Sequence, residues 1–544
     1  MRFGNNHRFW RQKIPSPDSQ GTTELISSVD FPIAEKKNGN TFFPETVEIS
    51  DSASPFSQTE QYPVNPPHAS IAVLFNKKEN AHHYHVIEPV LTETSKAVKA
   101  AIENRLFETL NVHTAGLTPK EAAHTLTSAF DQIISDLKIP LSPQQHDDIL
   151  YYLHRDYIGN GRIDAIMHDP HIEDISCDGV GTPVFVYHTR YESMETNISY
   201  NSAVELDGFV TRLAQRTGKY ISIAEPVLDA TMKDGSRVQM TLGTEVTARG
   251  STFTIRKFRD DPITPTDLIE WGTFSAEAMA FIWLMVESGK SCIFAGGTAS
   301  GKTTSLNAIS LFIPPRVKIV SLEDTRELKL PHLNWIPSIT RNSYDPDGKG
   351  VIDMYELLRA ALRQRPEYLI VGEVRGHEAL TLFQAMSTGH ITYATMHADS
   401  IESIVHRLEN PPLNVPRTML DALDMVSIQV QARVDGKRVR RTKRIVEILS
   451  FDTHTHEMIT NEVFRWDQPT DTILFSGTSY LLKKICDEKG YSETEIHEEL
   501  GRRTEVLTWI QKSAIRNYRD VSTVFTDYYH DPEELFHRIR GNEL

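Results

Sequence analysis

The spacing of hydrophobic residues changes along the chain and divides it into regions. Between about residues 261 and 450, helical stripes of apolar residues alternate with short apolar runs such as Val317–Leu322 and Tyr368–Val371. A short run that is apolar throughout is typical of a strand buried on both faces of a parallel sheet. Its alternation with helices predicts a largely parallel α/β core over residues 261–450.

A smaller α+β domain is predicted before this core, over residues 140–260. Helical spacing covers Pro143–Arg155, and strand-like runs cover Pro183–Tyr187 and Arg237–Thr241. The segment Asp261–Pro265 contains two prolines, which disfavour both helix and sheet. We therefore expect a linker there between the two domains.

Residues 59–139 predict a small region of strand and helix. Two strand-like runs, Ser70–Phe75 and His82–Val86, flank a polar turn, and Thr92–Leu110 has helical spacing. The apolar stripe of this helix consists of Val98, Ile102, Leu106 and Leu110. Order is expected to begin near Tyr62.

The two ends of the chain are more polar. Residues 1–58 are rich in Ser, Pro, Asn, Thr and Glu without sustained periodicity, which is typical of disorder. Residues 451–544 contain polar helical stretches such as Glu493–Ile515, so we expect a mostly helical C-terminal extension.

Composition narrows the class of protein. A chain of 544 residues is too long for one hydrophobic core. Its net charge of −16 argues against a protein that mainly coats nucleic acid. The longest strongly apolar stretch, Ala278–Val286, is far shorter than the roughly 20 residues that cross a bilayer. We expect a cytoplasmic protein that reaches the inner face of the cell membrane only through a partner.

Neither the cysteines nor the histidines predict a resident metal site. The chain has three widely separated cysteines: Cys177, Cys292 and Cys486. They form no CxxC pair, which favours a reducing compartment over a zinc site or disulfides. His82, His83 and His85 are close enough in sequence to suggest metal binding, but an exposed strand face is the simpler interpretation.

One motif predicts a nucleotide site. Gly296–Thr303 reads GGTASGKT and matches the phosphate-loop pattern GxxxxGK[ST] in full, with the apolar strand Ser291–Ala295 before it and a helix starting at Thr304. The expected nucleotide-binding residues are Gly296, Gly297, Thr298, Ala299, Ser300, Gly301, Lys302, Thr303 and Thr304. Lys302 would contact the β- and γ-phosphates of ATP, and Thr303 would bind Mg²⁺.

Carboxylates follow two of the predicted core strands. Glu373 ends the strand Tyr368–Glu373, where ligands bind in open α/β sheets, and would act through Mg²⁺. The segment Glu323–Glu327 holds three carboxylates that can orient water for attack on a γ-phosphate. The alternatives are a helix cap for Glu373 and a solvated acidic turn for Glu323–Glu327.

A histidine follows another strand of the core. His397 comes at the end of the strand within Tyr393–Ala398 and can hydrogen-bond a γ-phosphate. Taken alone, His397 fits a structural role equally well.

In this order, the four elements resemble those of the secretion and type IV pilus superfamily of motor ATPases. They are most similar to its archaeal branch, which includes archaellum and archaeal pilus motors. The matching segments are Gly296–Thr303 for the Walker A box, Glu323–Glu327 for the Asp box, Leu369–Glu373 for Walker B and Thr388–His397 for the His box. The resemblance covers roughly residues 60–450.

The resemblance implies a fold and a set of catalytic residues. It implies an α/β fold with a RecA-like P-loop ATPase core, preceded by a smaller α+β N-terminal domain. The implied catalytic residues are Glu327, Glu323, Glu373, His397, Arg237 and Arg256, with Arg249 as a weaker candidate. Glu327, or else Glu323, positions water. The arginines reach the nucleotide from the N-terminal domain, and Thr303 and Glu373 hold Mg²⁺.

The resemblance also implies how the protein works. Such proteins form hexameric rings, in which ATP hydrolysis changes the angle between two domains of each subunit. The implied function is to drive type IV pilus-like filament assembly or protein secretion. The implied partners are a polytopic membrane platform protein and, indirectly, pilin-like or secreted subunits.

Two other functions remain open. The segment Lys437–Arg444 carries six basic residues in eight after an Asp-Gly turn, which is compatible with a nucleic-acid translocation ATPase. Aromatic residues for base stacking are absent from it, so a solvated strand or a docking surface is the better interpretation and no nucleic acid is expected. A scaffold that binds ATP without hydrolysis is the third possibility, and the complete set of acids argues against it.

Overall fold

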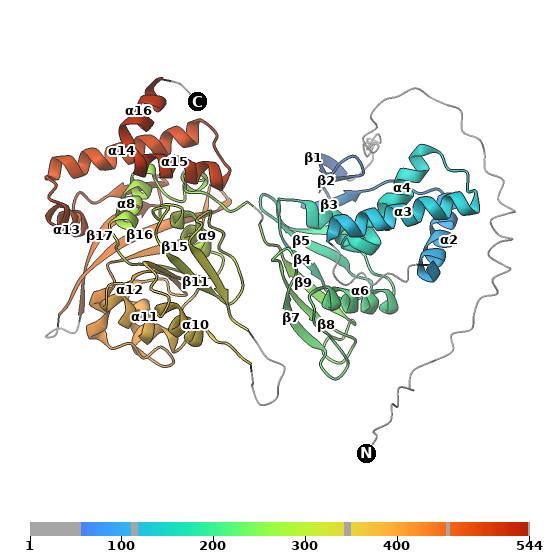
Figure 1. Cartoon of the computed structure of the whole chain (residues 1–544), viewed down its shortest axis with the longest axis horizontal. Helices are drawn as coiled ribbons and strands as arrows, with labels where there is room; N and C mark the ends of the chain where they lie inside the picture. Colours follow the sequence, from blue (N-terminus) through green and yellow to red (C-terminus); the bar gives the residue numbers. More distant parts are fainter. Residues whose placement is uncertain (1–55, 110–117, 260, 342–349, 453–456, 542–544) are drawn as a thin grey trace, which may run out of the picture. The chain divides into compact units, whose positions relative to one another are not determined.

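The computed structural model describes residues 56–109, 118–259, 261–341, 350–452 and 457–541 (Figure 1). The chain separates into two compact units, with the division after Phe258. The disorder expected for residues 1–55 and the last residue of the predicted stripe, Leu110, lie outside the described residues.

The first unit is built on a mixed sheet of nine described strands in the order β1-β2-β3-β6-β5-β4-β9-β8-β7. Neighbouring strands are antiparallel except β3 and β6, which pair in parallel over a short stretch. The strands are β1 (Phe56–Asn65), β2 (Ala69–Asn76), β3 (Ala81–Ile87), β4 (Ile172–Cys177), β5 (Pro183–His188), β6 (Glu192–Ser199), β7 (Val227–Thr231), β8 (Arg237–Thr241) and β9 (Thr252–Arg256). The strands expected around residues 70–75, 82–86, 183–187 and 237–241 are thereby confirmed.

Helices form two cores in this unit. Helix α6 (Ala203–Arg216) packs on the sheet, where its buried face shares a core with Val238 and Ile255. A smaller core between three helices contains the predicted stripe residues Val98, Ile102 and Leu106. The helices before β4 are α2 (Glu93–Thr109), α3 (Pro119–Leu137), α4 (Pro143–Leu153), the π-helix η1 (His154–Ile158), the 3₁₀-helix η2 (Gly161–Ile163) and α5 (Asp164–His168).

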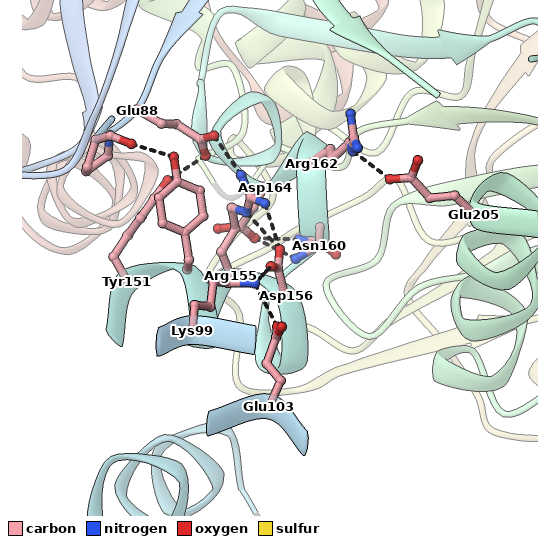
Figure 2. A network of polar contacts seen from close by, with 12 residues as sticks. Glu88, Lys99, Glu103, Tyr151, Arg155, Asp156, Asn160, Arg162, Asp164 and Glu205 are labelled. Atoms are coloured by element: carbon pink, nitrogen blue, oxygen red, sulfur yellow. Dashed lines mark hydrogen bonds and ion pairs between the residues drawn. The ribbon is translucent and has the colours of Figure 1, made fainter. Parts of the chain in front are cut away.

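Figure 2 shows the polar contacts around the end of α4. The helix predicted over Pro143–Arg155 continues as η1, which carries Arg155 and Asp156. Arg155 Nη1 lies 2.7 Å from Glu88 Oε2, and Lys99 Nζ lies 3.1 Å from Asp156 Oδ2. Since these side chains are mostly buried, each charge needs an opposite partner. The contacts therefore fix η1 to α2 and to the segment that follows β3.

The expectation that order begins near Tyr62, with residues 56–58 disordered, is wrong. β1 begins at Phe56 and pairs along its length with β2. It is an edge strand whose residues are partly or fully exposed, so it lacks the apolar alternation that identifies a strand. Its position at the edge also accommodates Pro63 within a strand.

The three histidines of β3 do not share one exposed face. His82 lies on the side of buried Tyr84, because residues two apart share a strand face. Its ring centroid lies 4.9 Å from that of Tyr191, while His83 Nε2 lies 2.8 Å from Glu79 Oε2. The interpretation as one exposed strand face is therefore wrong for His82.

The second unit contains a sheet of nine described strands in the order β12-β11-β13-β14-β10-β15-β16-β17-β18. The six strands from β12 to β15 are parallel, and β16 to β18 add in antiparallel fashion. They are β10 (Cys292–Gly296), β11 (Ile319–Glu323), β12 (Trp335–Ile339), β13 (Tyr368–Val371), β14 (Ile391–Met396), β15 (Met425–Val434), β16 (Lys437–Asp452), β17 (Glu457–Asp467) and β18 (Thr472–Phe475). The predicted parallel α/β core is confirmed.

Helices cover both faces of this sheet, and Figure 1 shows the two layers on opposite sides. Along β10, Phe294 faces one core and Ile293 the other, as period-two alternation requires. The first layer consists of α8 (Ala276–Glu287), α9 (Lys302–Ser310), α13 (Tyr480–Lys489), α14 (Glu493–Lys512), α15 (Tyr518–His530) and α16 (Pro532–Gly541). The second consists of α10 (Met354–Leu362), α11 (Glu378–Ser387), α12 (Ile401–Glu409) and the 3₁₀-helix η3 (Arg417–Ala422).

Two expectations for this unit need correction. Pro265 does not lie in a linker: it is the first residue of α7 (Pro265–Glu270), whose cap is Thr264, because proline is tolerated in the first helical turn. The polar tail is not helical from residue 451 onward, since β17 and β18 extend the sheet before the four helices begin. The boundary expected at residue 450 thus falls inside β16.

The C-terminal helices explain why α8 is apolar all round. Every residue from Ala278 to Val286 is buried. Such a helix needs cover on both sides, and residues of α14 and α15 share its core.

Among the described residues, no helix combines the length and apolar character that crossing a bilayer requires. The three cysteines are free and buried.

Candidate active site

The phosphate-loop motif lies between β10 and α9, as its sequence context predicts. A Cβ on Gly296 would come within 2.4 Å of the Gln429 carbonyl oxygen and 2.5 Å of Ser300 Oγ, so only glycine fits there. Gly301 precedes α9 with φ of 92°, a left-handed conformation that favours glycine. Steric contacts therefore require glycine at position 296, and the left-handed backbone favours glycine at position 301.

Lys302 lies at the start of α9, with 7% of its surface exposed. Its Nζ donates a hydrogen bond of 2.7 Å to the Gly297 carbonyl, and Ser300 Oγ donates one of 2.9 Å to the same oxygen. Among the residues that the structure describes, no side chain caps the N-terminus of α9. Its first amide groups and the Lys302 ammonium can therefore bind a phosphate.

Glu373, His397 and Arg375 form one polar cluster beside the phosphate loop. Glu373 Oε1 lies 3.3 Å from His397 Nε2, and Arg375 donates a hydrogen bond to Glu373 Oε2. Burial alone would raise the pKa of Glu373, but the hydrogen bond and charge of Arg375 outweigh it and hold the pKa below its ordinary value. Lys302 and His397 contribute in the same direction.

Glu323 lies at the end of β11, which neighbours β13 in the sheet, and is 2% exposed. Its Oε1 accepts hydrogen bonds from the backbone amides of Glu327 (2.8 Å) and Leu328 (2.9 Å). Its Oε2 is buried without a hydrogen-bond partner among the described residues. Burial raises the pKa of Glu323 to about 7, against the effect of these two amides.

Gly372 brings the two acidic elements together. A Cβ on Gly372 would lie 3.2 Å from Glu323 Cγ, so the backbone before Glu373 runs directly past the Glu323 side chain. Glu327 is less buried and lies at the far end of the turn that Glu323 caps. The acids that sequence analysis treated as two motifs thus meet at one edge of the sheet.

Arg375 is a site residue for which the sequence predicted no role. Besides binding Glu373, its Nη1 lies 3.6 Å from Asp324 Oδ2, and the charge of Glu327 also acts on it. It therefore links the turn after β11 with the segment after β13. Arg375 follows Glu373 by two residues in the sequence, but nothing in the sequence shows which acids it contacts.

The candidate arginines Arg237, Arg256 and Arg249 lie in the first unit, and the phosphate loop lies in the second. Arg237 on β8 is directly opposite Arg256 on β9, and Asp174 on β4 is opposite Arg256 on the other side. Arg249 is exposed in the loop before β9. Two like charges opposite each other destabilise a sheet, and the Asp174 carboxylate beside Arg256 offsets part of this repulsion.

The side chains at the sheet edge also fit Mg²⁺. Magnesium usually keeps several waters and takes only one or two protein ligands together with phosphate oxygens. Among the described residues, no group of three His, Cys, Asp or Glu side chains could hold a metal alone. The Thr303 hydroxyl and the Glu373 carboxylate, whose pKa is held below its ordinary value, supply hard oxygen donors of the right kind.

Comparisons with known proteins place this geometry in a family. The family model described as "Type II/IV secretion system protein" matches residues 182–468, just over half of the 544 residues. Models described as PilB3-like, N-terminal and PilB3-like, C-terminal match residues 45–90 and 469–544. The similarity thus extends beyond residues 60–450, the range expected from the motifs.

Two relatives illustrate the range of similarity. An uncharacterized protein of Methanocaldococcus jannaschii is 37% identical over 491 residues, covering 86% of this chain and 88% of that protein. The type IV secretion system protein PtlH of Bordetella pertussis is 37% identical over 183 residues, 31% of this chain and 52% of that protein.

Solved structures match over parts of the chain. The Legionella pneumophila ATPase DotB has a TM-score of 0.39 with 20% identity, over 53% of this chain and 80% of that one. The pilus retraction motor PilT with bound ADP has a TM-score of 0.35 with 16% identity, over 62% and 90%. On the family match and the archaeal relative aligned over most of both chains, this protein belongs to the type II/IV secretion system ATPase family.

Proposed function

We propose that this protein is a motor ATPase that hydrolyses ATP with Mg²⁺ to drive type IV pilus-like filament assembly or protein secretion. One observation carries the proposal. The phosphate loop and the ends of β11, β13 and β14 bring Lys302, Glu323, Glu373 and His397 to one edge of the parallel sheet. Phosphoryl transfer to water requires a cationic group that binds the phosphates and acids that hold Mg²⁺ and position water, and these residues supply both.

Each residue has a distinct part in this proposal. Lys302 and the first amides of α9 bind the phosphate chain and stabilise charge that develops on the γ-phosphate. Thr303 and Glu373 hold Mg²⁺, which supplies charge neutralisation on the phosphate oxygens. His397 lies beside Glu373 and hydrogen-bonds the γ-phosphate.

We assign the positioning of water to Glu323 ahead of Glu327, which reverses their order in the sequence analysis. The support is that Glu323 is buried beside Gly372 and keeps one carboxylate oxygen unpaired among the described residues. A pKa near 7 also suits a general base at neutral pH, because the ionised form is available and still accepts a proton.

Family members form hexameric motors, and we propose a hexamer here. Arg237 and Arg256, with Arg249 as a weaker candidate, would complete the nucleotide site from the N-terminal unit, and an arginine supplied by a moving element is worth roughly 10³-fold or more in rate. The proposed partners are a polytopic membrane platform protein and, through it, pilin-like or secreted subunits. The proposed location is the cytoplasmic face of the membrane.

The alternative is a nucleic-acid translocation ATPase, favoured by the basic hairpin of β15 and β16. A probable conjugal transfer protein TrbB of Sinorhizobium fredii is 31% identical over 236 residues, 43% of this chain and 69% of that protein. However, at least three of the six cations of Lys437–Arg444 contact the protein itself. Arg444 Nε lies 3.0 Å from Glu462 Oε2. Arg440 Nε lies 3.0 Å from the Ala299 oxygen, and Arg441 pairs with Asp471. We therefore rank the motor of filament assembly or secretion first.

The test is phosphate release by the full-length protein with ATP, with and without Mg²⁺. We expect Mg²⁺-dependent hydrolysis that Lys302→Ala abolishes, because the γ-phosphate loses its main cationic partner. Hydrolysis by Lys302→Ala at the wild-type rate would show that the site is elsewhere. Salt-sensitive stimulation of hydrolysis by DNA would favour the alternative.

A further inference from the structure

The hairpin of β15 and β16 extends past the end of β10, alongside the phosphate loop. β15 pairs with β10 as far as Gln429, opposite Gly296, and then continues to Val434. On β16, Thr442 is opposite Gln429 and Arg440 is opposite Gln431. The register therefore places Arg440 two residues beyond the last paired residue of β10, where the chain has turned into the phosphate loop.

Arg440 contacts the loop directly. Its Nε donates a hydrogen bond of 3.0 Å to the Ala299 carbonyl. Its Cδ lies 3.4 Å from where a Cβ on Gly301 would be, so the side chain also packs on the loop just before α9. Both contacts involve the part of the loop that leads into Lys302.

The Ala299 carbonyl, which Arg440 contacts, belongs to the peptide bond that sets the direction of the Ser300 amide. Ala299 has a φ of 57°, a left-handed conformation that a residue with a side chain adopts only where its surroundings impose it. The peptide bond is planar and trans, so the Ala299 carbonyl and the Ser300 amide point in opposite directions. Holding the carbonyl on Arg440 therefore turns the Ser300 N–H away from the hairpin.

The neighbouring residue fixes the strand that carries Arg440. Arg441 is 7% exposed and makes two hydrogen bonds of 2.8 Å to the Asp471 carboxylate. A third bond of 2.8 Å joins its Nη1 to the Trp271 carbonyl. These bonds tie β16 to the turn between β17 and β18 and to the end of α7. Arg440 is thus presented to the loop from a strand anchored by its next residue.

We propose that Arg440 is a positioning residue for the nucleotide site: it orients the Ala299–Ser300 peptide so that the loop amides face the phosphates of ATP. This inference rests on the proposed ATPase function and deepens it. It also gives the basic hairpin a role within the motor. Arg440 acts through the loop backbone and does not itself need to touch the nucleotide.

Four variants of the full-length protein separate the hydrogen bond from other effects. Arg440→Ala removes the whole side chain. Arg440→Met keeps a long stem that can pack near Gly301 but has no donor. Arg440→Lys keeps a charge and a donor. Lys443→Ala, an exposed cation on the same strand, is the matched control. The measurements are ADP affinity by calorimetry, KM and kcat for ATP, and the melting temperature.

We expect Arg440→Ala and Arg440→Met to weaken ADP binding and raise the KM for ATP about 10-fold, the effect of losing one hydrogen bond from a charged donor. Arg440→Lys is expected to recover to within about 3-fold of the wild type, and Lys443→Ala to equal it. The melting temperatures of all four variants should stay close to that of the wild type, because Arg440 is partly exposed and Arg441 still anchors the strand.

Three results would overturn the proposal. Arg440→Ala could match Lys443→Ala in ADP affinity and KM. Arg440→Met could match the wild type, which would leave packing as the only role. Arg440→Ala could lose thermal stability along with its ADP affinity, which would mean that Arg440 only stabilises the fold. If the wild type binds ADP but releases no phosphate from ATP, the proposed function fails, and the ADP measurements still decide the role of Arg440.

Discussion

His397 Nε2 lies 3.3 Å from Glu373 Oε1, so the imidazole after β14 and the carboxylate after β13 are direct neighbours. Burial lowers the pKa of His397, and the charge of Lys302 adds to this effect against the opposing charge of Glu373. The lowered pKa therefore favours the neutral imidazole at neutral pH. It serves as a hydrogen-bonding group beside the acid proposed to hold Mg²⁺, and not as a permanent cation.

We expect His397→Gln to lower kcat for ATP hydrolysis about 10-fold, the value of one well-placed hydrogen bond, with KM changed less. Glutamine can still donate to Glu373, but it cannot reproduce the reach of the ring. His377→Gln is the control, because His377 is exposed immediately before α11. Steady-state phosphate release compares them, and equal kcat in the two variants would contradict a role for His397.

A second prediction separates the two glutamates after β11. Glu323→Gln keeps an oxygen for the amides of Glu327 and Leu328 while removing the charge. We expect kcat to fall roughly 10²–10⁴-fold, as for a lost general base, with ADP affinity little changed. The kcat of Glu327→Gln should fall by about 10-fold at most, because a partly exposed carboxylate is held less firmly in position. The reverse order of the two variants would restore Glu327 as the acid that positions water.

The pH dependence of the wild type offers an independent check of Glu323. Burial raises the pKa of this carboxyl to about 7, and only its ionised form accepts a proton from water. The value of kcat/KM should therefore rise as pH increases through about 7. A profile that is flat from pH 6 to 8 would speak against Glu323 as the base.

The sequence predicted the second unit well because buried strands and the phosphate loop have strong local signals. Strands at the centre of a parallel sheet, such as Tyr368–Val371, are apolar on both faces. Gly296 and Gly301 are required by the backbone of a tight turn. Local patterns of this kind do not depend on distant partners, so they can be recognised in isolation.

What the sequence could not predict depends on contacts between distant segments. β1, β17 and β18 have no clear alternation, and they are strands because a neighbouring strand pairs with them. The unpaired oxygen of Glu323 and the link from Arg375 to Asp324 follow from the adjacency of β11 and β13. The contact of Arg440 with Ala299 likewise depends on sheet register. Composition and spacing carry no information on such pairings.

A third prediction concerns acid stability of the first unit. His188 is completely buried, and its Nδ1 accepts hydrogen bonds from the amides of Arg190 (3.0 Å) and Tyr191 (3.3 Å). These bonds require Nδ1 to be unprotonated. Its Nε2 lies 3.3 Å from the Tyr62 hydroxyl, which donates to Asp169. Burial lowers the pKa of His188 to about 4, against the charge of Asp169.

The direction in which stability changes with pH follows from the pKa values of His188 in the unfolded and folded protein. The unfolded chain binds a proton at this histidine below about pH 6.5, whereas the folded protein binds it only near pH 4. Stability is therefore lost as pH falls from about 6.5 to about 4, by up to about 3 kcal/mol from this residue. Urea unfolding followed across this range should show a shallower pH dependence for His188→Gln than for the wild type, and parallel curves would exclude His188.

The last prediction tests whether the C-terminal helices are an integral part of the ATPase unit. Arg503 on α14 is 2% exposed, and it makes an ion pair with Glu287 at the end of α8 and another of 2.8 Å with Glu499. Its guanidinium also lies 4.8 Å from the ring centroid of Trp283 on α8. One side chain therefore joins the extension to the buried helix of the core.

Arg503→Ala should destabilise the second unit by about 3 kcal/mol, because it leaves Glu287 and Glu499 short of their buried partner and opens a gap over Trp283. The adjacent Arg502 is the matched control. It is 40% exposed and pairs with Glu533, so Arg502→Ala should cost less than about 1 kcal/mol. The urea midpoints of the two variants give the comparison. If both stay near the wild-type midpoint, α8 does not depend on this contact. A large drop only for Arg503→Ala would show that the core of the second unit is completed by the C-terminal extension.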